Sequence, residues 1–214
     1  MFSPDVERWL EAAGYEHHCF ISYPRIRNVE MQDCAKRVRD SIEKDLSYVI
    51  DSPKVFLDDH IPGGADWEAR LRQSLCRSIS MIALCSPMYF HPMHRWCGLE
   101  WAAMDHLSAL RLPGKDFRTI IPLIVRESAA LPQAVSKIQY IDISRVTLKG
   151  RRYYNTNEYR SRIRDVVDRI GAIAIAIAEA QVVTDCDAFT FPATSAFTHE
   201  PSPAESRSFW STSR

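Results

Sequence analysis

The chain has 214 residues, of which 46% are hydrophobic, and its 27 basic and 27 acidic side chains give a formal net charge of zero. This length and apolar content predict one globular domain with short extensions, because enough apolar surface is present to form a core. The balanced charge excludes the general attraction to nucleic acid or anionic membranes that a strongly basic chain would have.

The cysteines and the apolar runs indicate the compartment. Several cysteines lie inside apolar segments and none forms a Cys-x-x-Cys pair, which is typical of reduced thiols that behave as small hydrophobes. They are Cys19, Cys34, Cys76, Cys85, Cys97 and Cys186. The N-terminus lacks the features of a signal peptide, and the longest apolar run, residues 170–178, is too short to cross a bilayer. We therefore expect a cytoplasmic protein without membrane contact.

The first elements of the chain are two helices and a strand. Residues 3–13 predict a helix, because Ser3 can cap its N-terminus and Pro4 suits its first turn. The apolar segment 19–23 predicts a strand. Over residues 29–49 apolar side chains recur at steps of three and four, which predicts an amphipathic helix.

The middle of the chain continues this alternation. Residues 54–58 predict a second strand, and residues 60–64 form a loop rich in turn-forming residues. Asp66 can cap the helix that follows, and the apolar run 79–85 predicts the third strand.

The last elements are two helices and two strands. The positions Trp96, Leu99, Ala103, Leu107 and Leu110 have helical spacing. Residues 119–125 and 140–143 predict the fourth and fifth strands. Residues 158–181 alternate locally like a strand, but their longer four-three spacing predicts a helix.

Strands that alternate with helices predict an α/β fold, with a flavodoxin-like, five-stranded parallel sheet covered by helices on both faces. Ligands bind such sheets beyond the carboxyl ends of the strands. This rule places residues 22–27, 58–66 and 86–100 around one crevice.

The chain divides into a helical extension over residues 1–15, the main domain over residues 16–181 and a tail over residues 182–214. The tail is rich in Ser, Thr and Pro and has no sustained periodicity, which favours an irregular, flexible segment. It also contains an unusual number of aromatic residues, which leaves docking onto the domain or a partner as the alternative. They are Phe189, Phe191, Phe197, Phe209 and Trp210.

Several site types have little support. The glycine motifs of dinucleotide-binding folds and P-loops are missing from the sequence. His91, His94 and Cys97 could share a metal, but Pro92 interrupts the helix start and no fourth ligand is evident, so we expect no metal site. The basic cluster within residues 149–164 is better explained as a solvated helix start than as a nucleic-acid surface.

Glu100 is the most unusual ionisable residue. It lies between Trp96 and Trp101, and a carboxylate held among indoles is costly unless it is solvated, paired or used. One alternative is a surface carboxylate paired with Arg95. The other is a functional carboxylate beside an aromatic wall, which would suit a flat cationic ring with a sugar attached.

Three segments, in this order and spacing, resemble the Toll/interleukin receptor (TIR) domain family over about residues 16–180. They are Phe20–Tyr23 as the first box, Val55–Asp58 with Ile61–Gly63 as the second strand and BB loop, and Ser86–Tyr89 with Trp96–Glu100 as the Ser…Trp-Cys-x-x-Glu segment. The resemblance implies the TIR fold. It also implies one of two functions, because some members are NAD glycohydrolases of immune and antiphage systems and others are signalling scaffolds.

The resemblance also implies roles for single residues. Glu100 corresponds to the catalytic glutamate of the enzymes. The residues implied to line the NAD site are Ser22, Tyr23, Arg25, Asp58, Trp67 and Trp96, although Pro24 shifts Arg25 one place from the family pattern. The BB loop, implied to pack on a neighbouring protomer, consists of Asp59, His60, Ile61, Pro62, Gly63 and Gly64. NAD is then the substrate, and no cofactor is expected.

The implied reaction needs only one carboxylate. Nicotinamide leaves as a neutral molecule from a cationic ring, so its departure requires no general acid, and Glu100 would stabilise the oxocarbenium-like ribose. Capture by water gives ADP-ribose, and internal capture gives a cyclic product. The alternatives are a non-enzymatic TIR adaptor or virulence factor, and a TIR subunit whose trigger is sensed by a separate protein.

Overall fold

A computed structural model describes residues 3–25, 29–58, 66–126, 131–147 and 151–197. Within these ranges the sheet has five strands in the order β2-β1-β3-β4-β5, and every neighbouring pair is parallel. The strands are β1 (His17–Ser22), β2 (Val55–Leu57), β3 (Ser78–Cys85), β4 (Ile120–Ile124) and β5 (Ile141–Asp142). The predicted flavodoxin-like sheet is confirmed.

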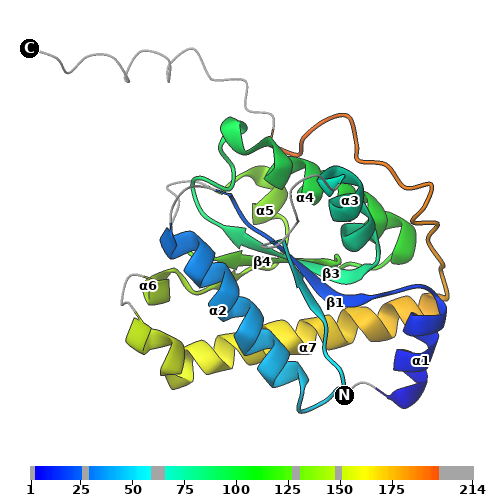
Figure 1. The fold of residues 1–214 in the computed structure, drawn as a ribbon, viewed down its shortest axis with the longest axis horizontal. Helices are drawn as coiled ribbons and strands as arrows, with labels where there is room; N and C mark the ends of the chain where they lie inside the picture. Colours follow the sequence, from blue (N-terminus) through cyan, green and yellow to red (C-terminus); the bar gives the residue numbers. More distant parts are fainter. Residues whose placement is uncertain (1–2, 26–28, 59–65, 127–130, 148–150, 198–214) are drawn as a thin grey trace, which may run out of the picture.

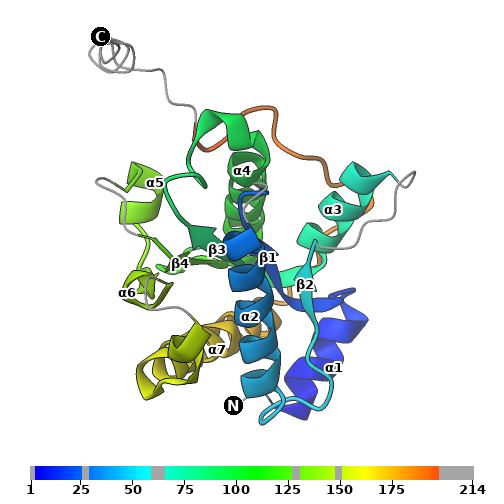
Figure 2. The same ribbon diagram turned by 60° about the vertical axis from the view of Figure 1, so that its left-hand side comes forward.

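Helices cover both faces of the sheet (Figures 1 and 2). One face carries α1 (Pro4–Ala12), α2 (Val29–Leu46) and α7 (Asn157–Ala180). The other carries α3 (Trp67–Cys76), α4 (Arg95–Arg111) and α5 (Gln133–Ser136). The remaining short elements are α6 (Ser144–Thr147), η1 (Pro92–His94) and η2 (Arg151–Asn155). These and α5 were not predicted, because one turn of helix is too short for a periodic signal.

Side-chain caps fix where α1 and α3 begin. Ser3 Oγ accepts a hydrogen bond from the Val6 amide at 3.3 Å, and Asp66 Oδ1 accepts one from the Ala69 amide at 3.1 Å. Both caps were predicted, and each satisfies an amide that has no partner within the helix. The ambiguous Ala-Ile repeat lies within α7, which confirms the helical interpretation.

The core has two parts, one on each face of the sheet. All residues of β3 are buried, as expected for the central strand of a parallel sheet with two covered faces. Neighbouring residues of a strand point to opposite faces, so Ile21 packs with the α2 and α7 side and Phe20 with the α3 and α4 side. The same alternation decides which residues after β1 can reach a site on the α4 side.

The first part of the tail docks on the domain. In Figure 1 this segment, coloured orange, leaves the end of α7 and runs past the sheet to the side of α3 and α4. Cys186 forms a disulfide with Cys76 at the end of α3, so the prediction of six reduced cysteines is wrong for this pair. Their sequence separation of 110 residues explains why spacing gave no signal. The other four cysteines are free and buried.

A buried arginine fastens the start of the tail. Arg111 is 0% exposed, donates to the Ser78 carbonyl at 2.9 Å and to Thr184 Oγ1 at 3.2 Å, and also bonds to the Cys76 carbonyl. Its guanidinium lies 4.9 Å from the centre of the Tyr15 ring. A buried charge is tolerated only with such partners, so Arg111 joins α4, β3 and the tail.

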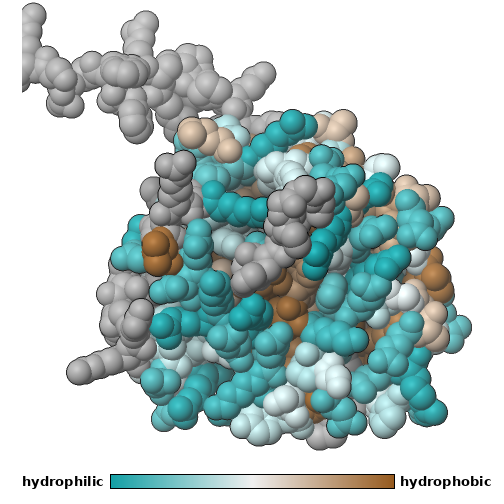
Figure 3. Space-filling model, viewed as in Figure 1, coloured by the Kyte–Doolittle hydropathy of each residue, from teal (hydrophilic) through white to brown (hydrophobic). Residues whose placement is uncertain are grey.

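The visible surface in Figure 3 is mostly polar, with hydrophobic residues in scattered areas. Leu110, which the helical spacing of α4 included among the apolar positions, is 47% exposed, whereas Leu107 and Arg111 on the same turn are buried, so Leu110 lies on the solvent side of the helix. Among the described residues, none of the helices has the length and apolar character needed to cross a membrane.

Candidate active site

The candidate site lies where three neighbouring strands end. β1 lies between β2 and β3, and Ser22, the last residue of β1, is in register with Ala83 of β3. Asp58 follows the end of β2 directly. The carboxyl ends of parallel strands meet at one edge of the sheet, and α4 begins beyond the same edge. This arrangement brings Glu100 of α4 to the end of β1.

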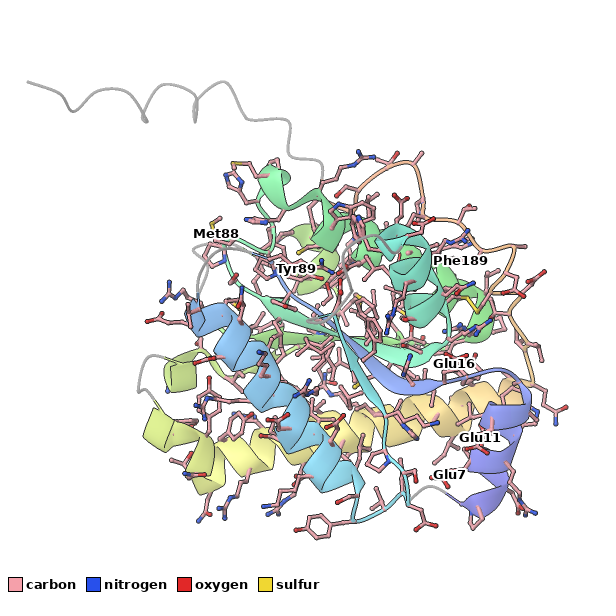
Figure 4. All side chains as sticks on the ribbon, in the orientation of Figure 1. Glu7, Glu11, Glu16, Met88, Tyr89 and Phe189 are labelled. Carbon is pink, nitrogen blue, oxygen red and sulfur yellow. A yellow bond between two sulfur atoms is a disulfide. The ribbon has the colours of Figure 1, made fainter. Side chains whose placement is uncertain are left out.

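Glu100 is linked to two other buried side chains. Ser22 Oγ donates a hydrogen bond to Glu100 Oε2, and the same Oγ lies 2.8 Å from the Tyr89 hydroxyl. Tyr89 comes from the turn after β3 and is labelled in Figure 4, next to the exposed Met88. Glu100 is 6% exposed, Ser22 is 1% exposed and Tyr89 is 0% exposed. The three groups therefore form one buried polar chain.

The surroundings of Glu100 change its acidity. Burial raises the pKa of Glu100 from its ordinary 4.5 to about 7, while the Ser22 hydrogen bond and the nearby Arg25 charge oppose part of this rise. Near neutral pH the carboxyl therefore exists in both protonation states. Carboxyls with a raised pKa are common in active sites, and they also occur among buried structural groups.

An aromatic wall stands beside the carboxyl. The Trp67 and Trp96 rings are in edge-to-face contact with centroids 4.6 Å apart. The Arg25 guanidinium lies 5.5 Å from the centre of the Trp67 ring and forms an ion pair with the buried Asp58. The structure thus brings five of the predicted NAD-site residues near Glu100: Ser22 at the end of β1, Arg25 and Asp58 just after β1 and β2, Trp67 on α3 and Trp96 on α4.

The tail covers part of this wall. Phe191 packs on Trp96 with ring centroids 5.6 Å apart, and Phe197 packs on Tyr89 at 5.9 Å and on Trp101 at 5.4 Å. The Arg72 side chain holds this part of the tail through a 2.8 Å hydrogen bond to the Phe189 carbonyl. In this conformation Phe191 contacts the Trp96 ring and Arg25 lies over the Trp67 ring, so side chains of the same chain contact both rings of the wall.

Other predicted residues lie elsewhere or outside the described ranges. Tyr23 packs against the core on the α2 and α7 side, away from Glu100, because it follows Ser22 in the alternating pattern of the strand. The BB loop residues from Asp59 to Gly64 lie outside the described residues. Among the described residues, no three or more His, Cys, Asp or Glu side chains are grouped to hold a metal ion.

Two features of the site were not assigned a role from the sequence. Tyr89 was recognised only as part of the Ser86–Tyr89 segment, although its position after the strand next to β1 could have indicated contact with Ser22. The covering role of Phe191 and Phe197 had no signal beyond the aromatic content of the tail.

One of two comparisons with known proteins gave a match. A family model described as TIR domain matches residues 19–153, which include all three strand ends and Glu100. A comparison with curated proteins gave no match.

Proposed function

Because the chain belongs to the TIR domain family, we propose that it is an NAD glycohydrolase with Glu100 as its catalytic residue. TIR domains include both signalling modules and NAD-cleaving enzymes. The observation that carries the proposal is the position of Glu100: a carboxyl with a pKa of about 7, buried at the strand ends beside two tryptophans.

The arrangement supports a dissociative cleavage. The bond between nicotinamide and ribose breaks with its electron pair going to the pyridine nitrogen, which becomes neutral, so no acid needs to protonate it. Ionised Glu100 stabilises the positive charge that develops on the ribose. Water then adds to the ribose carbon and loses a proton, which gives ADP-ribose; attack by another atom of the same molecule gives a cyclic product instead.

The direct test is release of nicotinamide from NAD by the purified chain, measured by chromatography. Glu100→Gln and Glu100→Ala are expected to lower kcat by at least about a hundredfold, the usual size of an electrostatic contribution of this kind. Glu43→Gln is the matched control, because burial also raises the pKa of Glu43 but α2 places it on the other face of the sheet. Full turnover by the Glu100 variants would refute the assignment.

We further propose that cleavage requires assembly, as part of an immune or antiphage response. Glu100 is nearly covered, and Phe191 and Arg25 lie on the tryptophan rings, so NAD has to displace groups that close the site. TIR domains self-associate, and contacts between protomers can supply the free energy for this opening. Specific activity should therefore rise with protein concentration or crowding, and Pro62→Asp in the BB loop should reduce that rise.

The same closure favours a second candidate, a non-enzymatic interaction module. The aromatic wall already contacts Arg25 and Phe191 of the same chain, so it needs no ligand to be stable. If Pro62→Asp abolished binding to a TIR partner while Glu100→Ala left both binding and the cellular phenotype intact, the interaction module would be the better description.

A further inference from the structure

Tyr89 occupies a position that the proposed reaction does not explain. It is 0% exposed, and its hydroxyl lies 2.8 Å from Ser22 Oγ, which itself bonds to Glu100. A fully buried phenol could be replaced by phenylalanine if only its ring mattered. The presence of the hydroxyl therefore needs its own explanation.

Counting protons gives the direction of each bond. Serine has one hydroxyl proton and can accept two hydrogen bonds, whereas an ionised carboxylate only accepts. If Glu100 is ionised, the proton of Ser22 points to Glu100 Oε2, and the bond between Ser22 and Tyr89 must use the Tyr89 proton. We propose that Tyr89 is a positioning residue, whose hydroxyl donates to Ser22 Oγ and thereby directs the Ser22 proton at the Glu100 carboxylate.

The backbone and ring contacts of Tyr89 suit this task. Its amide donates to the Ser86 carbonyl at 3.0 Å in the turn after β3, and its ring lies edge-on to Phe90, with centroids 5.4 Å apart, and to Phe197. Burial raises the pKa of Tyr89 well above 10, so the hydroxyl keeps its proton throughout the physiological range. The donor is therefore fixed in place and always protonated.

The consequence for Glu100 is a stabilised anion. Hydrogen bonds in a chain polarise one another, so a donor to Ser22 strengthens the bond from Ser22 to the carboxylate. In the part of the chain that the structure describes, the charged or titratable groups that face Glu100 are Arg25 from the segment after β1, Tyr89 after β3 and Cys97 on α4. Of these described groups, Arg25 and the chain through Ser22 favour the ionised form.

A role for Tyr89 in catalysis rests on the proposed function, but the test measures the protonation of the Glu100 carboxyl directly. The side-chain carboxyls of the full chain are labelled with ¹³C, the Glu100 signal is identified by its loss in Glu100→Gln, and its titration midpoint is followed by NMR. Tyr89→Phe is expected to raise the midpoint by about half a unit, and Ser22→Ala by about one unit or more, because Ser22 donates directly.

Tyr159→Phe is the matched control. Tyr159 is also a buried tyrosine, with a 3.2 Å hydrogen bond to Ser41 Oγ, but it lies on α7 beyond the other face of the sheet. Its removal should leave the Glu100 midpoint unchanged. Should Tyr89→Phe fail to fold, 3,5-difluorotyrosine at position 89 keeps the shape and donates more strongly, so the midpoint should fall.

The inference would be overturned if the titration midpoint of Glu100 were the same in the parent chain, in Tyr89→Phe and in the chain with 3,5-difluorotyrosine at position 89. If the chain cleaves NAD, the apparent pKa in the pH profile of kcat/KM should shift to higher pH in Tyr89→Phe, by the same amount as the NMR midpoint. If no NAD is cleaved, the proposed function fails, while the NMR midpoints still decide the role of Tyr89.

Discussion

The Ala196 amide donates a hydrogen bond to the Gly98 carbonyl oxygen, at a distance of 3.0 Å between nitrogen and oxygen. Gly98 lies on α4 in the same helical turn as Glu100, so the tail is attached to the helix that carries the candidate catalytic carboxyl. Next to this bond, Phe197 packs on the ring of Tyr89. Any change in how the tail docks should therefore alter the packing of the residues around Glu100.

Gly98→Ala should detach this part of the tail. A Cβ at Gly98 would lie 1.8 Å from Ser195 Oγ, 3.0 Å from Ser195 Cβ and 3.3 Å from Phe197 Cδ2. Rotating the serine hydroxyl relieves only the first clash, so the tail has to move. We expect the Ala196 amide to exchange with solvent roughly tenfold faster, as measured by hydrogen exchange, and the chain to lose about 1 to 3 kcal/mol of stability.

The rescue variant for this prediction is Gly98→Ala combined with Ser195→Gly. Removing the serine side chain eliminates the two closest contacts and should restore slow exchange at Ala196. If Gly98→Ala alone left that amide as protected as in the parent chain, the tail would not be packed against α4 in solution.

The disulfide should stabilise the fold. Joining Cys76 to Cys186 restricts an unfolded loop that spans 110 residues of sequence, which limits the conformations of the unfolded chain. Replacing both cysteines by serine is expected to cost about 2 to 4 kcal/mol in urea unfolding. Reductant should destabilise the parent chain and leave the double variant unaffected.

Thiol counting checks the same bond independently. The denatured chain should show four reactive thiols before reduction and six afterwards, because four cysteines are free. Six thiols before reduction would show that the bond does not form under the conditions of purification.

Phe191→Ala should make the aromatic wall easier to reach. Phe191 covers Trp96, and an aromatic pair of this kind contributes about 0.5 to 1.5 kcal/mol. If NAD has to displace Phe191, the apparent KM for NAD should fall about 2- to 10-fold, with Phe117→Ala, an exposed phenylalanine elsewhere, as the control. A KM that rises would instead indicate that Phe191 helps to bind the substrate.

The gathering of Ser22, Asp58 and Glu100 was predictable, because parallel strands end at one edge of a sheet and the helix after β3 begins there. Sequence reasoning grouped Tyr23 with Ser22, yet the two-residue period of a strand sends neighbouring side chains to opposite faces. Once Ser22 and Glu100 are assigned to one face of the sheet, the same period places Tyr23 on the other face.

The docking of the tail was not predictable in the same way. An irregular segment has no period, so nothing in the order of its residues pairs Phe191 with Trp96 or Cys186 with Cys76. These contacts depend on the shape of the surface made by α3 and α4, which exists only after the domain has folded. The aromatic content of the tail raised the question of docking without giving its place.

Glu100 should make the stability of the fold depend on pH. Its pKa is raised from 4.5 in the unfolded chain to about 7 in the folded one, so the folded state prefers the protonated carboxyl. The stability contributed by that proton is fully present below pH 4.5 and is lost as the pH rises through about 7, by about 3 kcal/mol in total. Glu100→Gln, which cannot ionise, should therefore be more stable than the parent chain at pH 8 by about this amount.

Urea unfolding of both proteins from pH 4.5 to pH 8 tests this expectation. The difference in unfolding free energy should be near zero at the acid end and grow toward pH 8, while other titrating groups cancel because both proteins share them. Glu179→Gln, which removes an exposed carboxyl of α7, is the control for the loss of one carboxyl without burial. A difference between Glu100→Gln and the parent that stays constant across this range would mean that Glu100 has the same pKa in the folded and unfolded chains, and burial would then not raise the pKa of Glu100.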